Sequence, residues 1–440
     1  MLRRKIYQQL VDWKDRKQNE CLMLKGARQI GKTFIVREFG KNEYDFFIEI
    51  NFLKKPELKE IFNGSLAADE IYKRLTAYLP ENRIVPGRTL IFLDEIQQCP
   101  KARTSLKFLA EDNRCDVIAS GSLLGLHYGQ DADPTVGTVD SVPVGYERQM
   151  MMYSLDFTEF LWGYGYQDDT LAYLKEYYDK REPLPTGLNE QFHNMLREYI
   201  VVGGMPEVVQ TFFDTKHYGE VQRVQDKILA SYDDDISNHV KTTEKAKVRA
   251  CYDSLPRQLA RENKKFKYSE VEKKATARKF EDSITWLRDA NLVNVCYNVS
   301  EPLLPLVANS KTEEFKVYTN DTGLLLARYG YQTKLAVLQK TLLGNAKGGI
   351  YENLIAEMLV KRGYRINYYR MANGSLELEF LIEKDGGVVP IEVKAGNTAT
   401  VSLNRFIETY HPPIAYKFID GNIGFSDSKL TLPHYMAMFV

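Results

Sequence analysis

The sequence lacks the features of a membrane protein, a disulfide-rich protein or a zinc protein. No window approaches the roughly twenty consecutive apolar residues that a membrane-spanning helix needs, and the basic N-terminus precedes no apolar signal core. The five cysteines are widely spaced, form no C-x-x-C pair and are odd in number, which is typical of reduced thiols. The six histidines include no pair at helical spacing. We expect a folded cytoplasmic protein that does not enter membranes.

The chain also lacks net charge, because 59 lysines and arginines balance 59 aspartates and glutamates. Attraction to nucleic acid must therefore come from a local patch. Residues 241–279 contain 13 basic and 5 acidic residues, a net charge of +8. This basic segment predicts a DNA partner, and a solvated basic face on helices that pack on another domain is the alternative.

One motif carries specific chemistry: Gly26-Ala-Arg-Gln-Ile-Gly31-Lys32-Thr33 fits the phosphate-binding pattern G-x-x-x-x-G-K-[ST]. Apolar residues precede it, and a helical apolar pattern follows it. The glycines let successive N–H groups face one centre, Lys32 reaches the β- and γ-phosphates, and Thr33 contacts magnesium. The predicted ligands are ATP and Mg²⁺. The predicted nucleotide-binding residues are Gly26, Ala27, Arg28, Gln29, Ile30, Gly31, Lys32, Thr33 and Asp94.

Polar residues end two later strands of the same predicted sheet. The apolar run at 89–95 ends in Asp94 and Glu95, so Asp94 is expected in the magnesium shell with Thr33, and Glu95 is expected to polarise the attacking water. The run at 116–122 ends in Ser120 and Ser122, which could hold that water or sense the γ-phosphate, or simply begin a turn.

Two arginines are candidates for a finger that completes the site of a neighbouring subunit. Arg148 follows a Gly-rich loop at 129–145, and Arg114 precedes the strand at 116–122. A cation supplied in this way stabilises charge on the transferred phosphoryl group, so the prediction implies a homo-oligomer. The alternative is an ordinary surface arginine.

At 440 residues the chain is too long for one core and is expected to be an α/β multidomain protein. Strand patterns at 46–51, 89–95 and 116–122 alternate with helical patterns, which predicts a doubly wound parallel sheet in residues 1–160. A helical lid or linker is expected at 161–240. Helices followed by a two-stranded ribbon predict a winged helix at 241–335. An α/β domain is expected at 336–440, with a hairpin across 385–387.

Acidic and basic residues on that hairpin suggest a second site. Glu379 on one strand faces Glu392 and Lys394 on the next, the arrangement of PD-(D/E)xK nucleases, and Glu352 on the preceding helix could add a metal ligand. Charges on one face of a half-exposed hairpin are the alternative explanation. Both interpretations stay open.

Five further stretches of the sequence contribute to a family resemblance: Ser154–Leu161, Gly203–Glu207, Lys316–Leu324, Tyr351–Asn353 and Pro390–Gly396. With the phosphate loop, Asp94-Glu95 and Ser120-Gly-Ser122, they resemble a prokaryotic group of AAA+ P-loop ATPases with a conserved C-terminal domain of unknown function. The resemblance implies ATP binding, a winged helix and a restriction-endonuclease-like C-terminal domain. Members commonly carry aspartate where this chain has Glu379.

The sequence thus predicts an ATP-binding and ATP-hydrolysing protein whose nucleotide state acts on a winged helix and a nuclease-like domain, with DNA as partner. The alternative is a nucleotide-controlled switch or interaction protein whose C-terminal domain binds without cutting.

Overall fold

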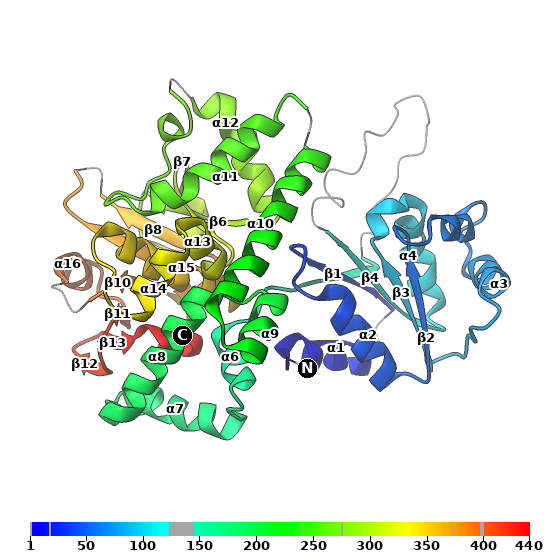
Figure 1. The fold of residues 1–440 in the computed structure, drawn as a ribbon, viewed down its shortest axis with the longest axis horizontal. Helices are drawn as coiled ribbons and strands as arrows, with labels where there is room; N and C mark the ends of the chain where they lie inside the picture. The colour runs from blue at the N-terminus through cyan, green and yellow to red at the C-terminus, as the bar shows by residue number, and fades with distance from the viewer. Residues whose placement is uncertain are drawn as a thin grey trace. The chain divides into compact units, whose positions relative to one another are not determined.

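The computed structural model describes residues 2–16, 19–122, 145–240, 242–273, 276–371, 373–396 and 400–440, with only the backbone of Ser122 and His239. The expected loop at 129–145 lies outside these residues, apart from Gly145. The contacts divide the chain into two compact units. One is Arg4–Tyr153, and the other consists of Ser154–Val440 together with Met1–Arg3. We refer to them as the N-terminal and C-terminal units (Figure 1).

The N-terminal unit is built on a five-stranded sheet in the order β2-β3-β4-β1-β5. Every neighbouring pair is parallel, as predicted for a doubly wound domain. The predicted strands at 46–51 and 116–122 have these bounds in the structure, and the third ends one residue early, at Asp94. The strands are β1 (Cys21–Gly26), β2 (Phe46–Asn51), β3 (Thr89–Asp94), β4 (Asp116–Ser122) and β5 (Glu147–Met151).

Helices cover both faces of this sheet. Helix α2 (Lys32–Glu43) lies against the sheet and contacts α1 (Lys5–Arg16). The buried residues of α1 are Ile6, Leu10 and Trp13. The other face packs on η1 (Pro56–Phe62), α3 (Ala68–Tyr78) and α4 (Pro100–Asp112). Strands covered on both faces are buried along their whole length, as β1 and β3 are, and most of their residues are apolar.

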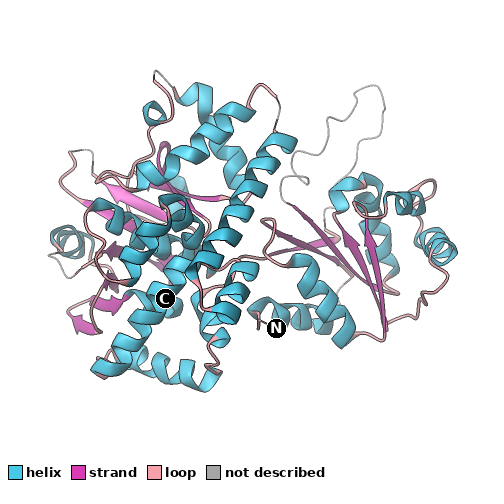
Figure 2. Cartoon of the chain, in the orientation of Figure 1, coloured by secondary structure: helices cyan, strands magenta, loops and turns pink. Residues whose placement is uncertain are grey.

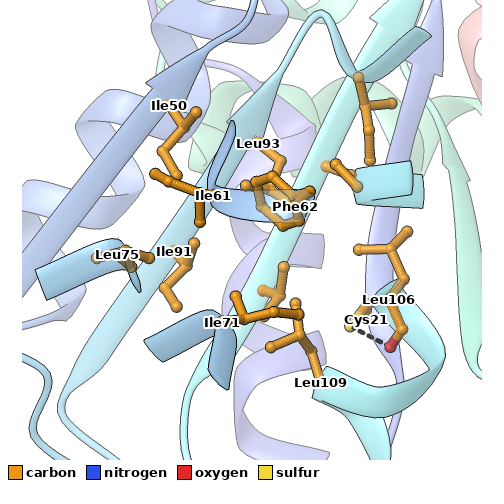
Figure 3. Close-up of a cluster of buried hydrophobic side chains, with 14 of the residues drawn as sticks. Cys21, Ile50, Ile61, Phe62, Ile71, Leu75, Ile91, Leu93, Leu106 and Leu109 are labelled. Atoms are coloured by element: carbon orange, nitrogen blue, oxygen red, sulfur yellow. Dashed lines mark hydrogen bonds between the residues drawn. The ribbon is translucent and has the colours of Figure 1, made fainter. Parts of the chain in front are cut away.

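On the face of the sheet covered by η1, α3 and α4, every second side chain of the strands packs against apolar side chains of these helices (Figure 3). Ile50, Ile91 and Leu93 come from the strands. The Cys21 thiol donates to the carbonyl oxygen of Leu106 at 3.3 Å. The other labelled side chains of this core are Ile61, Phe62, Ile71, Leu75 and Leu109.

All five cysteines of the chain are free thiols with buried side chains, as expected. Burial raises the pKa of Cys115 to about 11 and that of Cys251 to about 12. Little thiolate therefore exists at neutral pH.

The C-terminal unit begins with helices, as predicted for 161–240, and surrounds its sheet with more of them (Figure 2). None of the helices in the described part of the chain has the length and apolar character needed to cross a bilayer. The helices are α6 (Phe157–Gly163), α7 (Asp168–Lys180), α8 (Thr186–Val202), α9 (Pro206–Thr215), α10 (Tyr218–His239), α11 (Lys245–Leu259), α12 (Ala277–Asp289), α13 (Thr322–Tyr329), α14 (Tyr331–Leu338), α15 (Asn345–Lys361) and α16 (Val401–Tyr410).

The sheet of this unit is mixed and has eight strands, in the order β12-β13-β11-β10-β9-β8-β6-β7. The predicted hairpin is present, because β9 and β10 are antiparallel and the turn at Asp385 and Gly386 takes positive φ values of 50° and 76°. The strands are β6 (Val293–Val299), β7 (Ser310–Thr319), β8 (Asn367–Arg370), β9 (Glu377–Lys384), β10 (Gly387–Val393), β11 (Ala415–Ile419), β12 (Gly424–Ser426) and β13 (Lys429–Pro433).

The two-stranded ribbon expected to form the wing of a winged helix is part of the eight-stranded sheet. Strands β6 and β7 pair with each other, but β6 also pairs in parallel with β8 of the expected C-terminal domain. The last five residues of β7 are buried, as suits a strand inside a larger core and not a free wing. Residues 241–335 and 336–440 therefore share one sheet, and the boundary predicted at 335 does not interrupt it.

Three of the five C-terminal motifs that carry the family resemblance meet at buried Asp321. Its carboxylate accepts hydrogen bonds from the Gly204 N–H at 2.8 Å, the Ser154 hydroxyl at 3.1 Å and the Leu324 N–H at 3.1 Å. A Cβ on Gly204 would lie 2.0 Å from the Leu155 carbonyl oxygen, so this position requires glycine. These motif residues hold the interior together.

A second buried carboxylate extends the network. Glu357 accepts from the Thr322 N–H at 2.7 Å, the Tyr199 hydroxyl at 2.9 Å and the Lys361 ammonium at 2.6 Å. Lys361 also donates to the carbonyl oxygen of Leu155 at 2.9 Å. The first residues of the C-terminal unit, Ser154 and Leu155, are thus fixed to its core.

Candidate nucleotide site

The phosphate loop connects β1 to α2 through two glycines with different roles. Gly31 precedes α2 with a φ of 91°, a left-handed conformation that glycine adopts without strain. At Gly26 the requirement is space, since a Cβ would lie 2.3 Å from the Met152 carbonyl oxygen and 2.5 Å from Ile30 Cδ1. The first glycine therefore lets the loop pack on the segment that follows β5.

Asp94 forms the centre of the site at the carboxyl ends of the strands. Its Oδ2 accepts from the Thr33 hydroxyl at 3.0 Å and from the Asn51 amide at 2.7 Å. Its Oδ1 accepts from the Ser120 hydroxyl and from the Glu95 N–H. The side chain is buried, so these four donors fix its orientation.

The pairing of the strands explains why these residues meet. Asn51 lies opposite Asp94 across β2 and β3. Ala119 lies opposite Leu93 across β4 and β3, so the next residue, Ser120, comes beside Asp94. Polar residues at the ends of parallel strands line the crevice in which such sheets bind ligands.

Glu95 lies just past the end of β3 in a left-handed conformation, with a φ of 55°. This conformation costs a non-glycine residue about 1 to 3 kcal/mol and is concentrated at functional sites. The side chain accepts a hydrogen bond from the Gln97 amide. Glu95 is therefore held at the rim of the sheet beside Asp94.

The remaining loop residues lie between β1 and α2. Lys32 Nζ donates to the carbonyl oxygens of Gly26 at 3.0 Å and Ala27 at 2.8 Å, so the ammonium lies over the curl of the loop. Gln29 has a φ of 63°, which together with Gly31 turns the backbone back on itself. Arg28 and Ile30 complete this curl.

These residues fit the predicted ligands, ATP and Mg²⁺. The glycines form a curled backbone that ends at a helix N-terminus, with one ammonium over it, as polyphosphate binding requires. Thr33 and Asp94 supply two adjacent oxygens, a suitable donor set for a magnesium ion that keeps several waters.

The other predicted site residues lie at different places on the sheet. For Ser122 only the backbone is described, and it lies opposite Gly26 in the register of β4 and β1. Arg148 lies opposite Leu22, about 13 Å along β1 from Gly26, and contacts Glu20 at 3.4 Å. Arg148 therefore lies towards the end of β1 opposite the phosphate loop.

Arg114 also fails to join the loop of its own chain. It follows α4 and forms ion pairs with Asp112 at 2.7 Å and with Asp69. Two carboxylates thus hold it near the amino end of β4, where it stabilises a turn.

The second predicted cluster comes together as a network of glutamates and lysines. Lys394 lies 3.2 Å from Glu392 and 3.6 Å from Glu379. Glu352 pairs with Lys264 at 3.0 Å and Lys316 at 3.2 Å. Across the described ranges, no three His, Cys, Asp or Glu side chains are grouped to hold a metal ion.

Two members of this network have strongly shifted pKa values. Burial, assisted by Glu352 and Glu392, raises the pKa of Glu379 to about 7 despite the opposing charge of Lys394. Burial alone would raise the pKa of Glu352, but Lys316 and Lys264 lower it to about 2. The lysines therefore neutralise much of the charge that a metal ion would otherwise balance.

Part of the basic segment 241–279 also serves internal ion pairs. Lys264 contacts buried Glu352, and Lys265 lies 3.1 Å from Glu314 on β7. Arg261 pairs with Glu270 at 2.7 Å. The positive charge available to a partner is thus smaller than the sequence count.

Two residues, one beside Asp94 and one beside the phosphate loop, were not predicted from the sequence. Asn51 ends β2, and its place beside Asp94 could have been inferred from the parallel pattern, because it ends the preceding strand. Arg4 donates to the Ile30 carbonyl oxygen at 3.1 Å and the Tyr153 carbonyl oxygen at 2.7 Å. No sequence signal separates Arg4, which directly precedes α1, from the other charged residues of the N-terminal segment.

Three family models match separate parts of the chain. Residues 18–161 match an AAA domain, residues 193–335 match a domain of unknown function (DUF8612), and residues 347–430 match another (DUF4143). No curated protein matches the sequence.

Several solved structures align with the chain at low identity. A Walker-type ATPase of Pyrococcus abyssi has a TM-score of 0.41 and 13% identity, over 75% of this chain and 96% of that one. AMPPCP-bound DnaA from Aquifex aeolicus has a TM-score of 0.29 and 12% identity, over 65% and 88%. A signal-transduction ATPase with a tetratricopeptide repeat sensor from Pyrococcus horikoshii has a TM-score of 0.26 and 11% identity, over 82% and 46%.

The AAA match spans the phosphate loop, Asp94 and the strands that bring them together. The part of the chain that matches an AAA domain, residues 18–161, thus contains the phosphate loop, Asp94 and the parallel sheet that positions them.

Proposed function

We propose that this protein is a magnesium-dependent ATPase in which the nucleotide state of the N-terminal unit controls the C-terminal unit. The observation that carries the proposal is the convergence of Thr33, Asn51 and Ser120 on Asp94, at the end of the strand next to Glu95. A carboxylate fixed beside the phosphate loop, followed by a second carboxylate, is what metal-assisted phosphoryl transfer requires.

Each residue has a distinct role in this proposal. Lys32 would move from the loop carbonyls to the β- and γ-phosphates, and Thr33 with Asp94 would hold Mg²⁺. When bound, Mg²⁺ neutralises charge on the transferred phosphoryl group. Glu95 would accept the proton of the attacking water. Ser122 would hold that water or sense the γ-phosphate, and Arg148 would act in a neighbouring subunit.

The test is phosphate release from ATP by Glu95→Gln. We expect release to fall about 100-fold or more while ATP binding persists, because glutamine keeps the shape but cannot accept the proton. Lys32→Ala should lose binding itself. Glu81→Gln, an exposed residue of the same unit, serves as the matched control and should behave as the parent. Unchanged phosphate release in Glu95→Gln would refute the enzymatic role.

The short stretch of chain that connects the two units supports the proposed control of the C-terminal unit by nucleotide. Gly26 packs on the Met152 carbonyl, and Arg4 joins the Ile30 and Tyr153 carbonyls, all within the N-terminal unit. The next residue, Ser154, bonds to Asp321 of the C-terminal unit. A change at the phosphate loop would therefore reach the C-terminal core through consecutive residues.

We further propose DNA as the partner, through the basic segment 241–279, which contains α11 and the first residues of α12. The support is the local net charge of +8, of which part is used by internal pairs. Phosphate contacts release counterions, so DNA affinity should fall steeply between low and moderate salt. Salt-independent affinity would remove this segment from the proposal.

Two functions are considered for the C-terminal unit. A nuclease is favoured by the position of Lys394 between Glu379 and Glu392. A regulatory or interaction domain that does not cut is favoured by the lysines that already neutralise these carboxylates and Glu352. Metal-dependent cleavage that disappears in Lys394→Ala would support the nuclease, and no cleavage in the parent would support the second function.

A further inference from the structure

A small cavity in the C-terminal unit lies beside the start of α15, apart from both sites described above. Its volume, counted as the space open to the centres of water-sized molecules, is about 20 Å³. The enclosed part of the cavity can therefore hold one small group. Four charged side chains line it: Arg197 of α8, Lys340 and Lys347 near the start of α15, and Asp420 after β11. The lining is therefore predominantly cationic.

Arg197 is the unusual member of this set. The residue is only 5% exposed, and arginine is seldom buried without an acidic partner. Its guanidinium donates to the Asn194 side-chain oxygen, and no carboxylate of the described residues lies within 4.0 Å of it. A buried guanidinium with several remaining donors is suited to an anion.

The other charges of the cavity add to this preference. Lys340 and Lys347 form no ion pair with any residue in the described part of the chain, whereas Asp420 lies 3.4 Å from His193 Nδ1. Burial lowers the pKa of His193, which keeps this imidazole neutral at pH 7. The N-terminus of α15, a helix of 17 residues, contributes further positive potential.

The charge balance selects the class of anion. Three cations against Asp420 leave a net charge of +2, which matches a phosphate monoester with about −1.5 to −2 at pH 7. A carboxylate or a phosphodiester carries a single negative charge and would leave one cation unbalanced. The apolar lining of Val337, Ile350 and Tyr351 suits an organic group attached to the phosphate.

We propose that this cavity, lined by Arg197, Lys340 and Lys347, binds the phosphate group of a phosphate monoester. Both a nucleoside monophosphate and the 5′-phosphorylated end of a nucleic acid carry this group. The proposal does not depend on ATP hydrolysis, because all residues of the cavity belong to the C-terminal unit.

The test is calorimetric titration of the full chain carrying Lys32→Ala, which removes the phosphate loop as a competing site. The probes are adenosine 5′-monophosphate, acetate, and one oligonucleotide with and without its 5′-phosphate. We expect binding of the monophosphate, of the 5′-phosphorylated oligonucleotide, or of both, and the responding probe identifies the source. Acetate should bind at least tenfold more weakly than the monophosphate. At a salt concentration that screens the backbone contacts of the basic segment, the unphosphorylated oligonucleotide should likewise bind at least tenfold more weakly than its phosphorylated form.

The decisive variants are Lys340→Gln and Lys347→Gln combined, since Arg197 is buried and its replacement risks unfolding. The double variant should weaken binding of the phosphorylated probe at least tenfold, because hydrogen bonds to charged groups are lost. Lys227→Gln, at an exposed lysine of α10, is the matched control and should leave affinity unchanged. Equal affinity in the double variant, no binding of either phosphorylated probe, or equal binding of acetate would each overturn the proposal.

Discussion

Asn51 donates to Asp94 and so fixes the carboxylate that is proposed to hold magnesium. Asn51→Ala should raise the Mg²⁺ concentration for half-maximal ATPase activity about 10- to 100-fold, because residues that orient metal ligands have effects of this size. The measurement is ATPase activity across a magnesium titration. Asn63→Ala, an exposed asparagine of the same unit, is the control, and an equal magnesium requirement in both variants would exclude this positioning role.

Buried His434 makes the stability of the C-terminal unit depend on pH in the acidic range. Burial lowers its pKa to about 3, and its ring centroid lies 4.3 Å from that of Tyr351, with the two ring planes inclined by 38°. The unfolded chain binds this proton below about pH 6.5 while the folded chain does not, so stability falls as pH decreases from 6.5 towards 3. The slope approaches about 1.4 kcal/mol per pH unit.

The check is the free energy of unfolding of the parent and His434→Gln by urea at pH 7 and pH 5. We expect the parent to lose about 2 kcal/mol more than the variant over this range. His411→Gln, an exposed histidine, should match the parent. Glu379 contributes with the opposite sign, because its raised pKa favours the folded state as pH falls from about 7 to 4.5, and it is common to all three proteins.

At the scale of elements, the connection between β5 and α6 is where the proposed nucleotide control can be tested, because it packs on the phosphate loop. Arg4→Gln removes the charged link between the Ile30 and Tyr153 carbonyls. The variant should hydrolyse ATP but lose the nucleotide-dependent change in hydrogen exchange at the Leu155 amide, which donates to the Gly204 carbonyl. Hydrogen exchange with and without nucleotide measures this.

Lys5→Gln, one residue further along the N-terminal segment, provides the matched comparison. If Arg4→Gln and Lys5→Gln both kept a nucleotide-dependent change at Leu155, control through this segment would be wrong. If Arg4→Gln alone lost ATPase activity, Arg4 would instead act on the nucleotide site itself.

Single strands could be predicted from the sequence better than their partners. The runs 46–51, 89–95 and 116–122 are short, apolar and end in polar residues, so both their position and their ligand edge could be inferred. The ribbon of β6 and β7 shows where such inference stops. Its alternation fits a wing equally well, and only long-range pairing with β8 places it in the large sheet.

The same contrast applies to the sites. A phosphate loop is a local pattern, so Gly26 to Thr33 could be read directly, and Asp94 follows from the strand it ends. Lys316 and Lys264 could not be assigned to Glu352, because the partners come from separate elements and nothing local signals the pairing. Arg4 was missed for the same reason.

At the scale of the whole molecule, the two units have separate cores and are expected to unfold separately. ATP with Mg²⁺ should raise the melting temperature of one calorimetric transition, that of the N-terminal unit, by several degrees, because ligand binds only its folded form. Scanning calorimetry of the parent and Lys32→Ala checks this, and the variant should show no shift. A single transition shifted as a whole by ATP would mean that the units unfold together.

The burial of all five thiols has a practical consequence for spectroscopy. Reagents that label cysteine need an accessible thiolate, and the native residues provide none at neutral pH. One cysteine introduced on the surface of each unit, for example at Glu81 and at Lys227, would therefore be labelled selectively in an otherwise unaltered chain. Fluorophore or spin-label pairs at these points would report the separation of the units directly, with and without ATP.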